Sequence, residues 1–278
     1  MEKNCPSCNS EFTGNYCSNC GEKQMLPHER TMRYYIGRVI NSITFAESKM
    51  LNTFWTIIRK PGTVTNDFSK GRRIVYSSPI GLFFIGNLIY FLIPFLETFN
   101  TTLNVHTTMM PYSAFANKQV NKKIEQREVS LEEYEKSFNA ATNSNAKLML
   151  IIMVFLVCFG LAIICRKQDK FFGDYFILSL EINIYNLFVN TILLGLLLYP
   201  IVYLFAFLGV DLEPYLNDKI ITIVILISLS IFLFAAIKKA IQVSNLSAAL
   251  RCLMMLVWIG ISLQTYRFLL FLITYLTV

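Results

Sequence analysis

The sequence has few charged residues and little histidine. Of its 278 residues, 15% are charged, and His28 and His106 are the two histidines. It contains no HExxH, GxSxG or glycine-rich phosphate-binding motif, so the common signatures of metalloproteases, serine hydrolases and nucleotide-binding enzymes are missing. We expect a protein that is not an enzyme, and we expect both histidines to lie at the surface.

We also expect no cleavable signal peptide, because no basic patch followed by an apolar run stands near residue 1. Hydrophobic residues are abundant, at 54%, and include 23 phenylalanines. This composition is typical of a protein embedded in lipid. The chain is therefore expected to insert through internal apolar segments.

Four of the seven cysteines lie in the first twenty residues. Cys5 and Cys8 form one CxxC pair, and Cys17 and Cys20 form a second. Four thiolates at this spacing match the tetrahedral ligand set of a structural Zn²⁺ ion, which leaves no position open for catalysis. A redox disulfide is the alternative for one CxxC pair, but two matched pairs favour zinc. The sequence predicts a zinc ribbon over residues 1–26.

The residues around the two pairs also favour a ribbon. Gly14-Asn15 supplies a turn between them. Asn9 and Gly21 directly follow the pairs, where a left-handed backbone lets amides point at the sulfurs, and both residue types accept that conformation. The other three cysteines lie in apolar segments and are predicted to be packing residues: Cys158, Cys165 and Cys252.

Five segments are apolar enough to cross a bilayer, whose core needs about 20 helical residues. They are residues 79–97, 147–165, 175–209, 220–237 and 252–275. The third is long enough to be a tilted or protruding helix, a helix bent near Pro200, or two shorter passes. The predicted fold class is a mainly α, polytopic helical membrane protein of about five spans with a small N-terminal zinc ribbon.

The net charge of +7 is interpreted as topology charge, because much of the basic excess precedes the first span. Aromatic residues are too thinly interleaved there for a nucleic-acid groove. A reducing cytoplasm keeps the ribbon thiols free for metal, so the N-terminus is placed inside. Five spans then put six basic residues inside and three acidic residues outside: Arg166, Lys167, Lys170, Lys238, Lys239 and Arg251, against Asp211, Glu213 and Asp218. The expected location is a bacterial inner membrane, with the C-terminus outside.

Residues 27–78 are predicted to be a cytoplasmic or interfacial amphipathic helical segment that precedes the transmembrane domain, residues 79–278. Its helical pattern stops at Pro61-Gly62, and a short second stretch places Val64 and Phe68 on one side. That stretch either lies with its apolar side in lipid or packs on the preceding helix. In the first case three basic residues meet anionic lipid headgroups: Lys70, Arg72 and Arg73.

The loop at about 98–146 is expected outside the membrane. Ser130 and Glu133 have the spacing of a capping box that begins a short helix through Phe138. The rest of the loop is predicted to be solvated coil.

The third span carries polar residues, which are costly inside a membrane and therefore mark candidate sites. They are Asp174, Glu181, Asn183, Asn186 and Asn190. On a regular helical wheel the two acids share one face and the asparagines another. An asparagine stripe indicates hydrogen bonds between helices, and the alternative is a hydrated cavity. Asp174 is predicted to pair with Lys170.

The order of these elements resembles a bacterial membrane family catalogued as domain of unknown function 3667. The resemblance rests on the cysteine ribbon and on the pattern from Lys60-Pro61-Gly62 through Asp67-Phe68 and Lys70-Gly71-Arg72-Arg73 to Tyr76 and Pro79. It also implies an acidic-His pair and further histidines early in the third span. This chain has Asp174-Tyr175 and Glu181-Ile-Asn183 there and no histidine. The resemblance implies an architecture and a location, and no activity.

Our first hypothesis is a membrane protein whose cytoplasmic zinc ribbon binds a protein partner or regulates the membrane part. The alternative is a transporter or channel component that uses the polar residues of the third span. The bilayer and anionic lipid headgroups are expected partners, nucleic acid is not, and a homo-oligomer is compatible with both hypotheses.

Overall fold

The computed structural model describes residues 3–5, 7–21, 48–92, 99–166, 170–209 and 218–278. The chain divides into two compact units, Met1–Lys49 and Met50–Val278. Several expectations lie outside the described residues: the helical pattern before residue 48, the position of His28, and the sides taken by Lys167, Asp211 and Glu213.

The first unit contains a short antiparallel hairpin. Strand β1 (Lys3–Asn4) pairs with β2 (Glu11–Phe12), and Lys3 lies opposite Phe12. The Phe12 side chain is buried with Cys5 and Cys17 in a small apolar cluster. The described residues of this unit bury little apolar surface, and small domains of this kind are usually stabilised by a metal or by disulfides.

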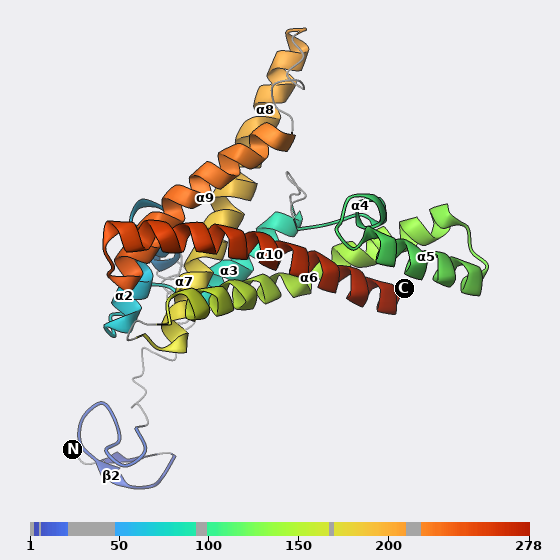
Figure 1. Ribbon diagram of the computed structural model, residues 1–278. Coiled ribbons are helices and arrows are strands. Elements are labelled where there is room, and N and C mark those ends of the chain that lie inside the picture. Colours follow the sequence, from blue (N-terminus) through green and yellow to red (C-terminus); the bar gives the residue numbers. More distant parts are fainter. Residues whose placement is uncertain (1–2, 6, 22–47, 93–98, 167–169, 210–217) are drawn as a thin grey trace. The chain divides into compact units, whose positions relative to one another are not determined.

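Among its described residues, the regular secondary structure of the second unit is entirely helical (Figure 1). A helix at residues 48–59 is followed by α2 (Thr63–Ser69), α3 (Pro79–Leu92), α4 (Leu103–Thr108), α5 (Ser113–Arg127), α6 (Leu131–Ile164), α7 (Phe172–Tyr185), the π-helix η2 (Asn186–Leu193), α8 (Leu194–Phe207), α9 (Asp218–Ile241) and α10 (Asn245–Thr277).

Four helical segments are long and apolar enough to cross a membrane: Leu131–Ile164, Phe172–Phe205, Lys219–Ile241 and Asn245–Thr277. The shorter apolar helix α3 occupies the place of the first predicted span. The predicted polytopic helical fold is therefore confirmed.

The third predicted span is one continuous helical run through α7, η2 and α8, and it is not two passes. Its middle is π-helical, so its turns are wider than those of an α-helix. Pro200 lies inside α8 and does not end the helix.

The core lies where α6, α7, α9 and α10 pack against one another. Gly160 on α6 lets α10 approach closely, because a Cβ atom there would lie 2.2 Å from the Trp258 ring. The Trp258 indole N–H in turn donates to the Leu156 carbonyl at 2.8 Å. Cys158, Cys165 and Cys252 are buried in this core, as predicted.

The segment at 98–146 is helical, so the prediction of solvated coil is wrong. The Ser130 hydroxyl accepts from the Glu133 N–H at 3.2 Å, as its capping box predicts, but the helix that begins there continues through Ile164. Ala116 and Val120, one turn apart on α5, pack with Phe138 and Phe271 in a second apolar cluster. Two small apolar residues in a polar sequence gave too weak a pattern to predict this helix.

His106 is buried on α4, so the prediction that it lies at the surface is wrong. One ring nitrogen bonds to the Tyr112 hydroxyl at 2.8 Å, and the ring lies close to Phe138 and Phe271. Burial, with a smaller contribution from the Arg267 charge, lowers the pKa of His106 to about 4. The histidine is therefore a neutral core residue near pH 7.

Candidate functional site

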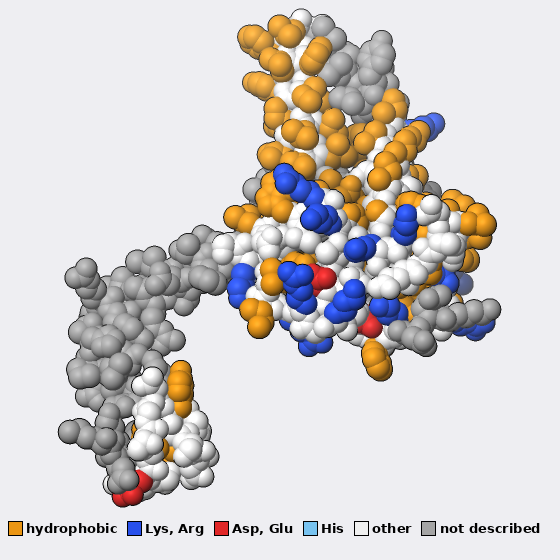
Figure 2. All heavy atoms as spheres, turned by 90° about the vertical axis from the view of Figure 1, so that its left-hand side faces the viewer, with side chains coloured by type: hydrophobic (Ala, Val, Ile, Leu, Met, Phe, Trp, Pro, Cys, Tyr) orange, Lys and Arg blue, Asp and Glu red, His pale blue; other side chains and the backbone are white. Residues whose placement is uncertain are grey.

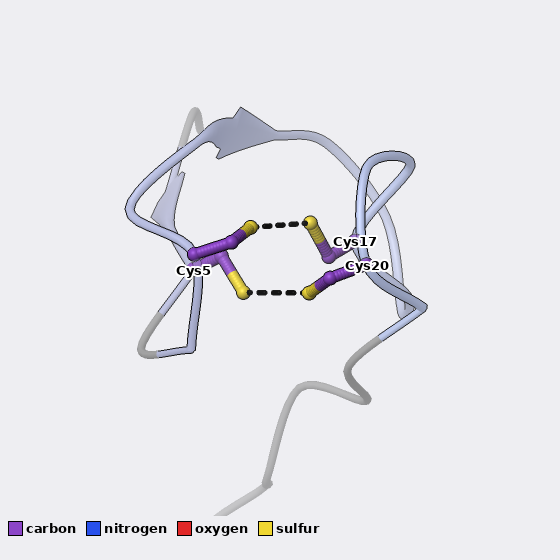
Figure 3. Close-up of side chains that lie close together, drawn as sticks. Cys5, Cys17 and Cys20 are labelled. Carbon is purple, nitrogen blue, oxygen red and sulfur yellow. Dashed lines mark hydrogen bonds between the residues drawn. The ribbon is translucent and has the colours of Figure 1, made fainter.

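The four N-terminal cysteines converge on one point. Their Sγ atoms all lie within 4.8 Å of one another. Cys5 Sγ is 3.5 Å from Cys20 Sγ, and Cys8 Sγ is 3.6 Å from Cys17 Sγ, so each contact joins one CxxC pair to the other. Figure 3 shows the side chains of Cys5, Cys17 and Cys20 pointing inward from facing loops.

The local backbone explains why the sulfurs point inward. Asn9 and Gly21, the residues after the two pairs, have φ values of 57° and 77°. Each N–H closes a turn by donating to the backbone carbonyl of the first cysteine of its pair, Cys5 or Cys17, at 2.9 Å. The left-handed conformation predicted for both positions is confirmed. The two halves of the site thus use the same turn.

Ser10 is a site residue that the sequence analysis missed. Its hydroxyl lies 2.7 Å from Cys8 Sγ and 3.5 Å from Cys17 Sγ. The hydrogen bond from Ser10, followed by one from the Cys20 N–H, lowers the pKa of the Cys17 thiol to about 6. The same hydroxyl lowers the pKa of Cys8. Thiolates bind metal, so these contacts favour the ligand form of both cysteines. A serine near a CxxC pair is too common a neighbour to predict such a role.

This geometry is close to that of a four-coordinate metal ion. A tetrahedral ion with metal–sulfur bonds of about 2.3 Å separates its ligands by about 3.8 Å. The two sulfur contacts between the pairs fall just below that value, and all four cysteines are free. In the part of the chain that the structure describes, these cysteines are the group of His, Cys, Asp or Glu side chains that can hold a metal ion.

Glu181, on α7, is fully buried and holds the start of α2. One carboxylate oxygen accepts from the Gly62 N–H at 2.9 Å. The other accepts from the Thr65 N–H at 2.5 Å and from the Thr65 hydroxyl at 2.6 Å. The first N–H groups of a helix have no partners within it, so the carboxylate takes the place of a side-chain N-cap. These three hydrogen bonds account for an acidic side chain inside the bundle.

Asp174, which lies nearer the start of α7 than Glu181, makes a second contact with α2. It accepts from the Ser69 hydroxyl at 2.8 Å and from the Phe171 N–H at 3.0 Å. The predicted ion pair with Lys170 is not among the ion pairs of the described residues. The two acids therefore share one helix face, as predicted, and that face carries α2.

The apolar side of α2 lies on protein. Val64 is completely buried, and the helix packs against α7 and α9. Of the two predicted arrangements, the one with the apolar side in lipid is therefore wrong. Of the three predicted headgroup residues, Arg72 lies 3.9 Å from Asp67, and Arg73 lies over the Phe68 ring. Lys70 lines a pocket beside α9.

The asparagines of the third span bond to other protein groups. The Asn183 amide donates to the Ser179 carbonyl of its own helix at 2.8 Å. Asn190 donates to the Asn186 side chain at 3.1 Å and accepts from the Ser228 hydroxyl of α9 at 2.7 Å. The predicted stripe is therefore divided, because the π-helix changes the spacing that a regular wheel assumes. Asn190 makes the hydrogen bond between helices that the stripe predicted.

Residues 47–91 match a family model described as "Protein of unknown function (DUF3667)". The resemblance inferred from the sequence is confirmed over that range, which contains all of α2 and most of α3 and excludes the four cysteines. No curated protein and no solved structure matches the chain. The match therefore coincides with the segment that docks on Glu181, and it brings no activity with it.

Proposed function

We propose that the four cysteines hold a structural Zn²⁺ ion, and that this ribbon is a cytoplasmic partner-binding or regulatory module of a multispan inner-membrane protein that is not an enzyme. The observation that carries the proposal is the convergence of four sulfurs within 4.8 Å. Four cysteine ligands complete a tetrahedral shell, so the metal keeps no open position for a substrate.

The surroundings of the sulfurs support a resident metal. Cys5 and Cys17 are buried, and among the described residues of the ribbon the buried Phe12 is the large apolar side chain packed with them. Thiolates prefer soft or borderline ions, of which zinc has no redox chemistry and accepts this geometry without strain. Bound metal would supply folding energy that so small an apolar cluster does not provide.

A binding role is supported by the ribbon surface, where Tyr16 is 61% exposed. Exposed aromatic side chains are enriched at protein interfaces. A cytoplasmic position is supported by the basic residues in the α6–α7 connection and in the last turn of α9, among them Arg166, Lys170, Lys238 and Lys239. Basic residues near span ends favour the inner side of a membrane.

The zinc site is tested on the full-length protein purified in detergent, by elemental analysis of bound metal. The wild-type chain should carry about one zinc ion, since one Cys₄ set binds one ion. Cys17→Ser should lose it, whereas Cys252→Ser, the same chemical change at a buried cysteine outside the set, should retain it. Equal zinc content in both variants, or iron in place of zinc, would contradict the proposal.

The partner role is tested by replacing Tyr16 with a photo-crosslinking amino acid in cells. A defined protein adduct should form in the wild-type background and with Cys252→Ser, and it should disappear with Cys17→Ser because the metal-free ribbon loses its fold. Adducts that are the same in all three backgrounds would show that the ribbon surface recognises nothing through its metal-dependent fold.

A further inference from the structure

A basic pocket lies between α2 and the end of α9, separate from the cysteine site. It has a volume of about 590 Å³, and four of its ten lining residues are lysines: Lys60, Lys70, Lys238 and Lys239. None of the lining residues is acidic. Figure 2 looks onto the face that carries α2, where Lys and Arg side chains gather and few acidic atoms are visible. Pockets of this size hold small ligands or parts of larger ones.

The carboxylates near this pocket are already engaged elsewhere. Glu181 accepts its three hydrogen bonds from Gly62 and Thr65. Asp67 accepts from the Tyr76 hydroxyl at 2.7 Å and lies 3.9 Å from Arg72. Asp174 accepts from Ser69. Among the described residues no ion pair neutralises the four lysines, so their charges repel one another across the pocket unless an anion binds there.

Neutral hydrogen-bonding groups complete the lining. The buried Asn66 accepts from the Gln242 amide at 2.9 Å through its side-chain oxygen, which leaves the Asn66 amide N–H groups for another acceptor. Thr63 is another lining residue. Gln242 has a φ of 59°, a left-handed conformation at the turn between α9 and α10 that places its side chain beside α2. Ammonium and amide donors around one space suit a ligand with several oxygen acceptors.

We propose that this pocket binds a phosphate ester anion, with the phosphate group among the four lysines. A phosphate group has the negative charge and the oxygen acceptors that complement these positively charged and amide donors. Pro61, Phe234 and Ala235 give the pocket an apolar side, at the end of a helix that can cross the membrane. Basic pockets between span ends are known places for anionic lipid headgroups. A lipid phosphate therefore matches both sides of the pocket, and a soluble phosphate matches its basic side.

This assignment differs from the headgroup contact expected from sequence. Lys70 belongs to both sets of residues. The pocket has Lys60, Lys238 and Lys239 as its other basic residues, whereas the sequence-based set had Arg72 and Arg73. The two lysines on α9 lie far in sequence from α2, and only the docking of α2 beside α9 brings them together with Lys60 and Lys70. The inference does not depend on metal in the cysteine site.

The lipid arm of the test titrates full-length protein in detergent with phosphatidic acid or with phosphatidylcholine of the same chains, and counts bound lipid by native mass spectrometry. The double variant Lys238→Gln/Lys239→Gln should lose about 25-fold in affinity for phosphatidic acid, at about fivefold per lysine. The matched control, Arg72→Gln/Arg73→Gln, removes the same charge from the neighbouring loop and should change affinity by less than about threefold.

The soluble arm measures thermal unfolding in inorganic phosphate against chloride at equal ionic strength. Stabilisation of the wild type that the lysine variant loses, without a preference among lipids, would assign the pocket to a soluble phosphate. Lys60→Gln/Lys70→Gln tests the α2 side of the pocket if the first pair does not fold. Loss of phosphatidic acid binding that is equal in the lysine and arginine variants, or no preference for phosphate in either arm, would overturn the proposal.

Discussion

Gly62 meets two separate structural demands. Its φ of 76° belongs to the left-handed region, and a Cβ atom there would lie 2.4 Å from the Ala236 carbonyl oxygen of α9. Gly71, just beyond the other end of α2, has a φ of 81° but nothing within 4 Å of an added Cβ. Substitutions at the two glycines therefore distinguish the cost of backbone strain from the cost of close packing.

Gly71→Ala should lower the free energy of unfolding by about 1 kcal/mol, the cost of a left-handed alanine. Gly62→Ala should lower it by about 3 kcal/mol or more, since overpacking against α9 adds to the same strain. Thermal unfolding of the detergent-solubilised protein compares the two variants. Equal losses would show that α2 does not dock as closely on α9 as the structure indicates.

Glu181→Gln tests the carboxylate that caps the start of α2. An amide offers one acceptor where the carboxylate offers two, so an N–H donor at the start of α2 would face an NH₂ group. We expect a loss of about 1–3 kcal/mol in the free energy of unfolding, and faster hydrogen exchange at the Gly62 and Thr65 amides. Glu125→Gln, at an exposed position on α5, is the control and should change stability by less than about 0.5 kcal/mol. Unchanged exchange at both amides would refute the capping role.

We expect the stability of helices α4 and α5 to depend on pH. His106 packs within their apolar cluster, and one of its ring nitrogens has no hydrogen-bond partner there. Its pKa of about 4 in the folded protein lies below the value of about 6.5 for an unfolded histidine. Its contribution is therefore fully present above about pH 6.5 and is lost as the pH falls toward 4.

Acidification from about pH 7 to about pH 5 should loosen α4 and α5, and the full contribution of His106 is about 3 kcal/mol. Hydrogen exchange in α4 and α5, corrected for the intrinsic effect of pH, measures the change. His106→Gln removes the titrating group, so its exchange should show little dependence on pH. A wild-type chain with equal protection at both pH values would contradict this assignment.

At the scale of the whole molecule, the C-terminal end of α10 packs beside the helices that precede α6. Phe271 on α10 packs with Ala116 and Val120 on α5, and the Lys123 ammonium group donates to the Tyr275 carbonyl. At the opposite end of α10, its connection to α9 lies beside α2, where Gln242 bonds to Asn66. The packing thus separates a face with α2 from a face with α5 and the C-terminus, as an odd number of spans requires.

Reporter fusions can test this topology. A fusion after Val278 and one inserted near Lys118 on α5 should report the same side of the membrane, because the two ends pack together. A fusion at residue 170, between α6 and α7, should report the other side, with the N-terminus. A C-terminal fusion that reports the side of residue 170 would be incompatible with five spans.

The sequence by itself determined the local features of this protein. The CxxC spacing, with Asn9 and Gly21 after the pairs, specified the cysteine site, because ligand spacing and left-handed turns are set by neighbouring residues. The apolar runs specified the membrane fold, since span length follows from bilayer thickness. Ser130 specified the start of α6 for the same local reason.

Only the tertiary structure decided which distant residues meet. Glu181 and Thr65 lie 116 residues apart, and Gln242 and Asn66 lie 176 apart, so no local pattern could pair them. The burial of His106 and the formation of α5 depended on contacts with Phe138 and Phe271, which a helical wheel of one segment does not contain. The sequence left open whether α2 faces lipid or protein. The tertiary structure makes it one wall of a basic pocket, because its N–H groups bond to a buried carboxylate and its apolar side packs on α7 and α9.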